Sequence, residues 1–375
     1  MEFSTEEKRQ YQRHFSLPDF GSKGQDLLKR ASVLVIGAGG LGCPVLQYLT
    51  AAGVGEIGIV DEDIVEFSNL QRQILYSHED IGKLKVDVAS TKLQQLNPYI
   101  KISSFAVRFN ASNAKSLLEN FDIVIDGTDN FDSRYLINDA CVLFDKVLIY
   151  GAINQFNGQV SVFNLQNGPT YRCLFPNPPS GNALPSCSEI GVLGVLPGII
   201  GNFQALEAIK VITGVGEVLN GKVLLYDALN QKSQIVTINP IPKSREIYQL
   251  SDQITPCPTH SQIKTDPMIT EIEPKKFSEM IEKQENLFVL DVREGWEREV
   301  AMIAPSVHIP LGEFSSSAGP DLPSEISRDN DIVIYCKAGV RSRMACEILQ
   351  EKGYQNLHNL SGGILKWEAD GFPFA

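Results

Sequence analysis

Two short segments of this chain carry residue types and spacings that could do chemistry. Near the start, a glycine-rich loop with the spacing G-x-G-x-x-G follows the apolar run 32–36; its glycines are Gly37, Gly39, Gly40 and Gly42. Such a loop lets the backbone approach phosphates closely, and the helix after it points N–H donors at them. Near the end, Cys336 begins the segment Cys-Lys-Ala-Gly-Val-Arg, a setting typical of a reactive thiol. Together they indicate an enzyme that activates something with a nucleotide and then delivers sulfur to it.

The residues after the glycine loop bear on which nucleotide is used. Asp61 ends the second apolar run, where its carboxylate can accept hydrogen bonds from ribose hydroxyls, and this pattern suits NAD and ATP equally. Phosphate chemistry also needs cations for the β- and γ-phosphates and a carboxylate for Mg²⁺, which Arg72, Lys85 and Asp129 can supply. These charges favour adenylylation over hydride transfer. The alternatives are a surface ion pair for Arg72, a loop cap for Asp61, and a cap of the helix expected from Phe131 for Asp129.

The Cys336 segment lies between an apolar strand at 332–335 and a helix expected from Arg341. The backbone N–H groups of the next five residues can curl around the sulfur; these residues are Lys337, Ala338, Gly339, Val340 and Arg341. The helix N-terminus and the side chains of Lys337, Arg341 and Arg343 add positive potential, which favours a thiolate or a persulfide anion. Cysteine phosphatases use a similar cradle with the spacing C-x₅-R, whereas this chain has C-x₄-R. The tighter loop suits a sulfur atom better than a phosphate.

Cys187 differs from the other cysteines because it lies in the polar segment 184–189. Cys43, Cys141 and Cys346 lie in apolar runs, as buried structural cysteines do. An exposed thiol in a polar loop can act as a nucleophile if it ionises. We expect Cys187 to take part in sulfur or acyl transfer. The alternative is a tolerated loop thiol, because adenylylation itself needs no cysteine.

A β-α alternation from residue 32 to residue 151 must position the nucleotide site. It predicts an α/β fold with a Rossmann-like, doubly wound, mostly parallel sheet. The expected strands are 32–36, 57–61, 101–106, 122–126 and 147–151, and the helices between them are 41–52, 83–96, 111–119 and 131–145. Helices within 5–30 precede this alternation, and a strand at 159–163, a helix at 196–211 and strands at 222–227 and 234–238 follow it.

Changes in pattern divide the chain into two domains. We expect a first domain over residues 1–240, a proline-rich linker over 241–268, and a smaller α/β domain over 269–375. The expected elements of the second domain are strands at 287–291 and 332–336 and helices at 274–283, 341–352 and 363–368.

The composition limits the class of protein. Of 375 residues, 43% are hydrophobic and 21% charged, as in ordinary globular proteins. A formal net charge of −12 argues against a general nucleic-acid binder, although it allows a local cationic pocket for phosphates. No run approaches the roughly 18 uninterrupted apolar residues of a membrane span, and the acidic start is unlike a secretory signal. Seven scattered cysteines indicate reduced thiols, so we expect a cytoplasmic protein without membrane or nucleic-acid partners.

Residues 8–240 resemble the ThiF/MoeB/HesA family, relatives of the ubiquitin-activating enzymes. The matching stretches are Tyr11-Gln12-Arg13, Gly37–Gly42, Asp61-Glu62-Asp63, Asn69–Gln73, Leu84-Lys85-Val86, Thr128-Asp129-Asn130 and Pro185-Ser186-Cys187. The resemblance implies that ATP adenylylates the C-terminal glycine of a small ubiquitin-like (β-grasp) sulfur-carrier protein that ends in Gly-Gly.

The resemblance also implies roles for individual residues. The residues implied to bind MgATP are Asn69, Arg72 and Lys85 at the phosphates, Asp61 at the ribose and Asp129 at Mg²⁺. Arg13 would reach into the neighbouring subunit's site as an arginine finger, which implies a homodimer. A surface or interface ion pair is the alternative for Arg13. Cys187 matches a cysteine that can be linked covalently to the carrier.

This chain departs from the family at the structural zinc ion that many members hold with two C-x-x-C pairs. The first pair would lie at 170–173, which reads Thr-Tyr-Arg-Cys, and the second would follow Pro240, where the chain reads Ile-Pro-Lys-Ser-Arg. Three of the four thiolates are absent, and tetrahedral zinc needs all four ligands. Cys257 and His260 are nearby but scattered, so we expect no zinc. Ordinary packing is one way to hold region 165–185 against 239–258.

The second domain resembles rhodanese. The matching residues are Leu290-Asp291-Val292-Arg293, Ser361-Gly362-Gly363 and Trp367, together with the intact Cys336 loop. The segment 299–304 lacks the usual His-Ile-x-Gly pattern, so we expect a different local geometry there. The alternative to a catalytic domain is an inactive rhodanese fold used for docking.

The domain order resembles that of the sulfurylases that serve molybdopterin synthesis and tRNA thiolation. We predict adenylylation of the carrier, attack by a persulfide on Cys336, directly or through Cys187, and reduction to a thiocarboxylate for a molybdopterin, thiamin or tRNA pathway. A cysteine desulfurase or thiosulfate would load Cys336. Two alternatives stay open: an NAD-dependent oxidoreductase fused to a sulfurtransferase, and a scaffold that binds a ubiquitin-like protein without turnover.

Overall fold

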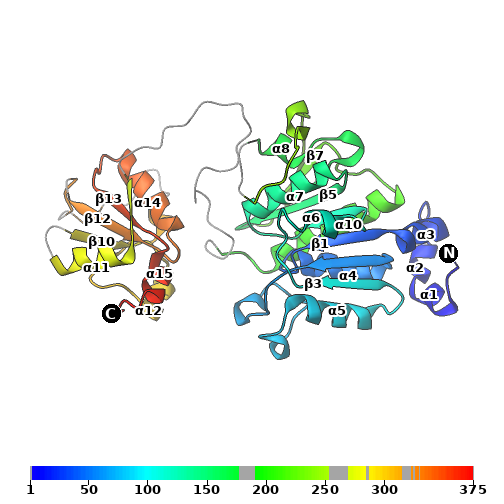
Figure 1. Ribbon diagram of the computed structural model, residues 1–375, viewed down its shortest axis with the longest axis horizontal. Helices are drawn as coiled ribbons and strands as arrows, with labels where there is room; N and C mark the ends of the chain where they lie inside the picture. The colour runs from blue at the N-terminus through cyan, green and yellow to red at the C-terminus, as the bar shows by residue number, and fades with distance from the viewer. Residues whose placement is uncertain are drawn as a thin grey trace. The chain divides into compact units, whose positions relative to one another are not determined.

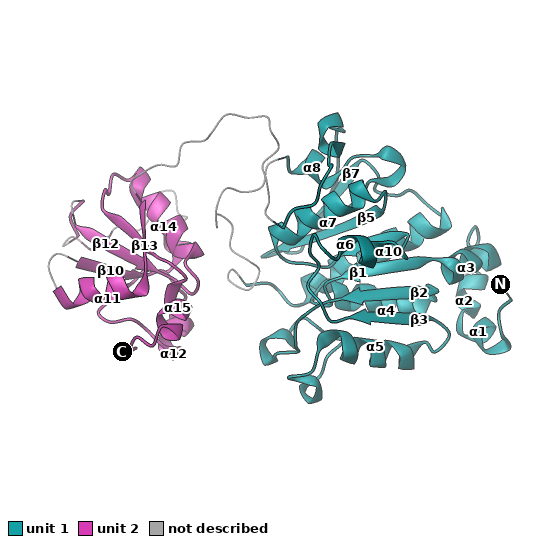
Figure 2. Cartoon of the chain, viewed as in Figure 1, with its two compact units in different colours: residues 1–178, 190–258 teal, residues 179–189, 259–375 magenta. Residues whose placement is uncertain are grey.

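The computed structural model describes residues 2–176, 191–252, 269–283, 287–314, 322–323, 326–328 and 330–374. They belong to two compact units (Figure 2): unit 1 contains the described residues up to 252, and unit 2 those from 269 onward. Cys187, for which a role in transfer is predicted, lies outside the described residues, as do Cys257 and His260.

An eight-stranded sheet forms the centre of unit 1 (Figure 1). In spatial order its strands are β3 (Lys101–Phe105), β2 (Glu56–Val60), β1 (Ser32–Ile36), β4 (Ile123–Asp126), β5 (Val147–Asn154), β6 (Asn157–Phe163), β7 (Lys222–Asp227) and β8 (Lys232–Thr237). The strands from β3 to β5 are parallel, and those from β5 to β8 pair antiparallel. The predicted fold class is therefore confirmed. The chain order reverses between β1 and β4, where open α/β sheets bind their ligands.

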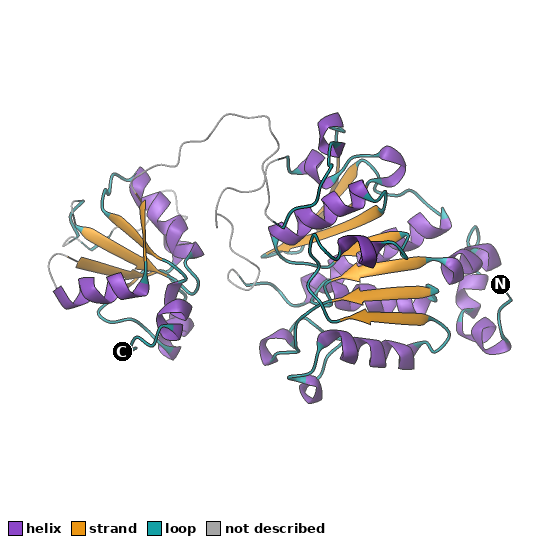
Figure 3. Ribbon diagram, in the orientation of Figure 1, coloured by secondary structure: helices purple, strands orange, loops and turns teal. Residues whose placement is uncertain are grey.

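Helices cover both faces of this sheet (Figure 3). They are α1 (Thr5–Gln10), α2 (Gln12–Phe15), α3 (Gly21–Arg30), α4 (Gly42–Ala52), α5 (Lys85–Leu96), α6 (Ala114–Leu118), α7 (Phe131–Leu143), α8 (Tyr171–Leu174) and α10 (Val195–Thr213), with short 3₁₀ helices η1 (Phe67–Asn69), η2 (His78–Asp80), η3 (Leu165–Asn167) and η4 (Pro242–Arg245). The helices expected between strands are present, with ends that differ by a few residues.

The side chains of β1 show how the sheet is buried. Val33 and Val35 pack on one face in a cluster that includes residues of α4 and α10. Leu34 and Ile36 pack on the other face in a cluster that includes residues of α6 and α7. Because both faces are covered, the strand reads as an uninterrupted apolar run, as buried parallel strands do.

Among the described residues, α10 alone is long and apolar enough to cross a membrane by length and composition. In this structure it packs against α4, β5 and β6, with Leu196, Ile200 and Ala208 buried. Its outer face carries two exposed apolar side chains, Val195 at 59% and Leu206 at 50%, together with the exposed Asn202.

Unit 2 contains a five-stranded parallel sheet. Its strands, in spatial order, are β11 (Val307–His308), β10 (Leu287–Asp291), β12 (Asp331–Tyr335), β13 (Leu357–Leu360) and β9 (Ile269–Ile272). Its helices are α11 (Pro274–Lys283), α12 (Gly295–Val300), α13 (Leu311–Phe314), α14 (Val340–Glu351) and α15 (Gly363–Ala369). The sequence predicts β10, β12, α11, α14 and α15, whereas β9, β11 and β13 are absent from the predictions.

Candidate active sites

The loops that follow β1, β2 and β4 meet at the carboxyl edge of the unit 1 sheet. Gly37 N–H donates to the carbonyl of Val60 and Gly127 N–H to that of Ile36, both at 2.8 Å. Gly37 has a φ of +95°, and a Cβ there would lie 2.8 Å from the carbonyl carbon of Gly127. A Cβ on Gly42 would lie 2.0 Å from the carbonyl oxygen of Gly37. The loop therefore requires glycine at both positions, and it ends at the N-terminus of α4.

Asp61 fastens the glycine loop. Its Oδ2 accepts a hydrogen bond from the Ala38 N–H at 2.7 Å, and its Oδ1 accepts one from the Asp63 N–H at 2.8 Å. Burial raises the pKa of Asp61, and the positive charge of Lys85 opposes that rise. Its contact with a ribose stays a prediction, but a carboxylate that holds this loop is in the right place for one.

Lys85 is joined to this loop through Asp63. The Lys85 Nζ lies 2.7 Å from Asp63 Oδ2, and the Lys85 N–H donates to the Asp63 carbonyl at 2.9 Å. Lys85 is 5% exposed at the start of α5, whereas the Asp63 side chain is 62% exposed. An incoming anion can therefore replace the exposed carboxylate as a partner without moving the buried stem of the lysine.

Asn69 is the last residue of η1, and Arg72 follows it by three residues. The Arg72 Cδ would lie 3.6 Å from a Cβ on Gly40, so this side chain runs beside the glycine loop, and its Nη1 donates to the Ser68 carbonyl at 3.2 Å. Asn69 is buried, and its Oδ1 accepts a hydrogen bond from the Glu66 N–H at 3.1 Å. Arg72 thus contacts the loop directly, while Asn69 holds the turn that presents it.

Asp129 is exposed in the loop after β4. The cap of the next helix is Asn130, whose side chain accepts a hydrogen bond from the Ser133 N–H at 2.9 Å. The interpretation of Asp129 as a helix cap is therefore wrong. Its carboxylate is solvent-exposed, on the loop that touches Gly37 through Gly127.

Sequence reasoning missed Asp126, which shapes this loop. Its buried Oδ1 accepts hydrogen bonds from the Thr128 N–H at 2.9 Å and the Thr128 hydroxyl at 2.7 Å, and so fixes the turn that leads to Asp129. Burial raises the pKa of Asp126, and the charge of Arg134 opposes that rise. Its place at the end of a predicted strand, two residues before Thr128, was the available signal.

Two more missed side chains pack against the glycine loop. The buried Tyr76 hydroxyl donates to the Ala38 carbonyl at 2.8 Å. The buried Gln73 places its Nε2 3.5 Å from where a Cβ on Gly39 would lie. Gln73 stands in a stretch with a family resemblance, whereas nothing in the sequence singles out Tyr76.

Arg13 lies far from the glycine loop of its own chain. It is exposed on α2, and among the described residues its side chain makes no hydrogen bond or ion pair. The neighbouring Tyr11 packs on Gly53, the last-turn cap of α4, and its hydroxyl accepts a hydrogen bond from the Asn97 amide at 2.8 Å. The glycine loop is at the other end of α4, a helix about 16 Å long at 1.5 Å per residue. Figure 1 shows α1 to α3 at the opposite end of the sheet from the tips of β1 and β2.

Cys336 directly follows β12, and its side chain is buried in the loop that leads into α14. Its Sγ accepts hydrogen bonds from the Gly339 N–H at 3.1 Å and the Ser342 hydroxyl at 3.4 Å. Gly339 has a φ of +96° and precedes the first residue of α14, so the start of that helix faces the sulfur. The geometry suits an anionic sulfur. Ser342 is a donor that sequence reasoning missed.

Residues of α15 and β13 contact the backbone of the Cys336 loop. Ile364 N–H donates to the Cys336 carbonyl at 2.9 Å, and a Cβ on Gly363 would lie 2.4 Å from that carbonyl oxygen. On the other side, the Asn359 amide donates to the Gly339 carbonyl at 2.9 Å and to the carboxylate of Glu271 at 3.0 Å. These contacts hold Gly339 with its N–H toward the sulfur.

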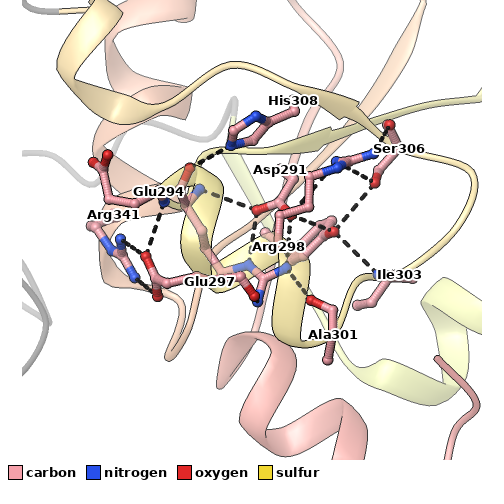
Figure 4. Close-up of polar contacts among 11 residues, drawn as sticks. Asp291, Glu294, Glu297, Arg298, Ala301, Ile303, Ser306, His308 and Arg341 are labelled. Atoms are coloured by element: carbon pink, nitrogen blue, oxygen red, sulfur yellow. Dashed lines mark hydrogen bonds and ion pairs between the residues drawn. The ribbon is translucent and has the colours of Figure 1, made fainter. Parts of the chain in front are cut away.

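The two arginines in the first turn of α14 do not add unpaired positive charge, which corrects the sequence expectation. Arg341 donates from Nη1 and Nη2 to the two carboxylate oxygens of Glu297, at 2.7 and 2.8 Å (Figure 4). Arg343 pairs with Glu271 at 2.8 Å and with Glu347 at 3.4 Å. Arg341 therefore fastens the loop to α12, and the carboxylates balance both charges.

A buried ionic network lies beside the Arg341–Glu297 ion pair (Figure 4). The Arg293 guanidinium donates to both oxygens of Asp291 at 2.9 and 2.8 Å, and the Tyr335 hydroxyl donates to Asp291 at 2.8 Å. Segment 299–304, which lacks the His-Ile-x-Gly pattern, is tied to this network because Arg293 donates to the Ala301 carbonyl at 2.7 Å. Arg298 and Ser306, on either side of the segment, share a hydrogen bond of 3.0 Å. Because Tyr335 directly precedes Cys336, the network also fixes the start of the cysteine loop.

Comparison with known proteins identifies the family of each domain. The sequence profile of the ThiF family matches residues 11–246, and that of the rhodanese-like domain matches residues 273–370. The chain is similar to the probable adenylyltransferase/sulfurtransferase MoeZ of Mycobacterium tuberculosis (strain ATCC 25618 / H37Rv), 40% identical over 97% of this chain and 93% of that protein. It is 38% identical to the adenylyltransferase and sulfurtransferase MOCS3-1 of Zea mays, over 97% of this chain and 82% of that protein.

Similarity to unit 1 alone is also found. The sulfur carrier protein adenylyltransferase of Thermus thermophilus is 51% identical over 65% of this chain and 92% of that protein. Among solved structures, E. coli MccB in complex with MccA-N7isoASN matches with a TM-score of 0.55 and 22% identity, over 64% of this chain and 74% of that chain, which shows the fold. This chain therefore belongs to the ThiF family, carries a rhodanese-like domain, and is an ATP-using adenylyltransferase and sulfurtransferase.

Proposed function

We propose that this enzyme adenylylates the C-terminal glycine of a small β-grasp sulfur-carrier protein ending in Gly-Gly, and then delivers sulfur from a Cys336 persulfide to give a thiocarboxylate. The observation that carries the first step is the placement of Arg72 against Gly40 and of Lys85 against Asp63, at the same glycine loop. Two cations beside a phosphate-binding loop suit the transfer of a charged phosphoryl group.

The residues around the glycine loop would contact different parts of the ATP molecule. The glycine loop and the start of α4 would receive the phosphates, with Asn69, Arg72 and Lys85 around them, and Asp61 would receive the ribose. The exposed Asp129 suits Mg²⁺, a hard cation that prefers oxygen ligands. When bound, Mg²⁺ would neutralise phosphate charge.

The chemistry proceeds by two displacements and a reduction. The carrier carboxylate attacks the α-phosphorus of ATP, and the bond to the β-phosphate oxygen breaks, releasing pyrophosphate. The terminal sulfur of the Cys336 persulfide then attacks the acyl carbon, directly or after transfer through Cys187, and AMP leaves with the electron pair of the C–O bond. A thiol reductant cleaves the resulting acyl disulfide to the thiocarboxylate. Adenylylation is needed because a free carboxylate has no good leaving group, whereas the acyl-adenylate can release AMP when sulfur attacks.

The buried cradle around Cys336 suits a persulfide anion, which Gly339 and Ser342 would stabilise by hydrogen bonds. Thiosulfate or the persulfide of a cysteine desulfurase would supply this sulfur. The cytoplasm is the compartment that we propose, because free thiols persist there.

The position of Arg13 supports a homodimer with shared active sites. An exposed arginine about one helix length from its own loop can serve a nucleotide site in a second copy of the chain. The exposed Val195 and Leu206 of α10 fit the same dimer, because covering large exposed apolar side chains removes them from water.

Mixed dimers test the shared site. Arg13→Ala and Asp129→Ala proteins should each lack ATP–pyrophosphate exchange. After unfolding and refolding in equal amounts, about a quarter of wild-type exchange should return, because half of the dimers are mixed and each has one intact site. No recovery, with dimers present by light scattering, would place Arg13 outside the partner's site.

The proposed reaction is tested by ATP–pyrophosphate exchange with a carrier that ends in Gly-Gly. Exchange should require both ATP and the carrier, and a carrier truncated by its last two glycines should give none. Exchange that is absent with every Gly-Gly carrier, together with binding of NAD, would favour the oxidoreductase alternative. Carrier binding without exchange would favour the scaffold.

A further inference from the structure

The positions that would carry the family's zinc ligands converge in this structure, although one cysteine remains among them. Thr170 and Cys173 have the C-x-x-C spacing at the start of α8, and Ile241 and Ser244 have the same spacing at η4. Two hydroxyls and one thiol are not the donor set of tetrahedral zinc. Within the part of the chain that the structure describes, no group of three or more His, Cys, Asp or Glu side chains could hold a metal. These residues do not fit a zinc ion.

Their side chains instead contact one another directly. The Thr170 hydroxyl donates to Ser244 Oγ at 2.9 Å, Ser244 Oγ lies 3.2 Å from Cys173 Sγ, and Cys173 Sγ lies 3.6 Å from Thr170 Oγ1. With the first bond in that direction, a closed ring satisfies all three groups, since each can donate once and accept once. Thr170 is fully buried and Ser244 nearly so, which keeps water from competing for the bond between their hydroxyls, whereas Cys173 is partly buried.

Backbone donors complete the arrangement around the sulfur. Ile241 N–H donates to Cys173 Sγ at 3.2 Å, and Thr170 N–H does so at 3.3 Å. The first of these bonds crosses from η4 to α8, as does the contact of Ser244 with both Thr170 and Cys173. Cys173 is therefore a centre to which donors from both segments are attached.

Other contacts hold α8 to α7 rather than to η4. Arg172 donates to both carboxylate oxygens of Asp139 at 2.7 Å, and the buried Tyr171 ring packs edge-on against Tyr135 with centroids 5.0 Å apart. Toward η4, the Arg245 guanidinium reaches the Gly168 carbonyl at 2.8 Å. The attachment of α8 to η4 thus depends mainly on the ring and its backbone donors.

We propose that Thr170, Cys173 and Ser244, with the Ile241 amide, form a metal-independent hydrogen-bond knot that fastens α8 to η4 in place of the zinc ion of other family members. The knot keeps the geometry of the metal site. Four sulfurs bound to zinc at about 2.3 Å lie about 3.8 Å apart, and the three side-chain separations here, 2.9, 3.2 and 3.6 Å, are all shorter than that. Three substitutions to cysteine should therefore restore a zinc site.

Two sets of variants of the full chain test the knot and its geometry. Thr170→Val and Cys173→Ala each break the ring and should lower the Tm of unit 1, identified as the transition that ATP raises, by about 2–6 °C. Thr91→Val is the matched control, because its hydroxyl bonds within α5 and is exposed, and its Tm should stay within about 1 °C of wild type. The triple variant T170C/I241C/S244C should bind one zinc ion, measured by elemental analysis, and its Co²⁺ form should show thiolate-to-cobalt charge-transfer absorption.

The wild-type protein decides the central point without any variant. It should purify with far less than one zinc per chain, and a chelator should leave its Tm unchanged. Stoichiometric zinc whose removal lowers the Tm would overturn the proposal, with Cys257 or His260 then the ligands to examine. Unchanged Tm values in both Thr170→Val and Cys173→Ala would also overturn it, because the ring would then hold nothing. A triple variant that folds, as judged by exchange activity, yet binds no zinc would refute the retained geometry.

Discussion

Replacing Glu297 with glutamine removes the charge that balances Arg341 while keeping the shape of the side chain. The Glu297 and Arg341 side chains are 10% and 8% exposed and share two hydrogen bonds of 2.7 and 2.8 Å. Removing one member of such a buried pair costs about 3–5 kcal/mol, because the remaining buried charge loses that partner. A glutamine oxygen can still accept one of the two bonds, so we expect a loss of about 2–4 kcal/mol for unit 2.

This loss should be visible as a change in melting temperature. For a domain of about 100 residues, it corresponds to a fall in Tm of about 10–20 °C, measured by calorimetry on the full chain. The rate of thiosulfate-to-cyanide sulfur transfer should also fall, since Arg341 ties the Cys336 loop to α12. This rate is measured below the Tm of the wild type and of the variant. The matched control is Glu347→Gln, which removes a 56% exposed partner of Arg343 and should cost less than about 0.5 kcal/mol.

Similar shifts for Glu297→Gln and Glu347→Gln would refute this reasoning. A second variant separates the lost charge from lost packing. Adding Arg341→Met to Glu297→Gln also removes the charge of Arg341 and should recover part of the lost stability. If the two substitutions acted independently, their losses of stability would add.

The same ion pair predicts a dependence on pH. Burial alone would raise the pKa of Glu297, but the hydrogen bonds and charge of Arg341 outweigh it and hold that pKa below its usual value. A carboxyl with a lowered folded-state pKa stabilises fully above its unfolded pKa, about 4.3, and the contribution is lost as pH falls through the folded pKa. The Tm difference between wild type and Glu297→Gln should therefore be constant from pH 7 to 5 and shrink in stronger acid. A constant difference down to acid unfolding would contradict the assignment.

Three further predictions separate the two activities. Gly37→Ala should abolish ATP–pyrophosphate exchange, because a Cβ at φ +95° meets the Gly127 backbone at 2.8 Å, and wild-type exchange would show that the loops do not meet. Lys85→Ala should lower exchange by about 10²–10³-fold, as expected for the loss of a charge at a developing anion, and leave thiosulfate-to-cyanide transfer intact. Cys336→Ala should show the reverse, losing sulfur transfer and retaining exchange, and a loss of both activities in either variant would contradict this division of labour.

Much of the fold of unit 1 could be predicted because its signals are local. The run Val33–Ile36 is apolar on both faces since helices cover both sides of β1, and the glycine spacing after it follows from sterics within the loop. In unit 2, β9 and β13 were missed because each mixes apolar and polar residues. Two of the polar ones, Glu271 and Asn359, are hydrogen-bonded to each other although they are far apart in the chain.

The candidate sites show the same limit. The types and spacing of Arg72, Lys85 and Cys336 were enough to suggest their chemistry. The direction of the Arg341 side chain could not be predicted, because its partner, Glu297, is distant in sequence and approaches only in the folded unit. Asp126 was missed for a related reason: its role is to hold a turn, and a turn-holding carboxylate carries no motif of its own.

The central claim is that adenylylation and persulfide transfer act in sequence on one carrier, and one measurement tests it most directly. The Cys336 sulfur is loaded with ³⁵S-labelled thiosulfate, the excess is removed, and a Gly-Gly carrier is added with ATP and a thiol reductant. We expect a labelled thiocarboxylate, identified by the mass change from oxygen to sulfur at the carrier terminus. Its formation should require ATP, Lys85 and Cys336 alike. A labelled thiocarboxylate made without ATP, or by the Cys336→Ala protein, would contradict the account.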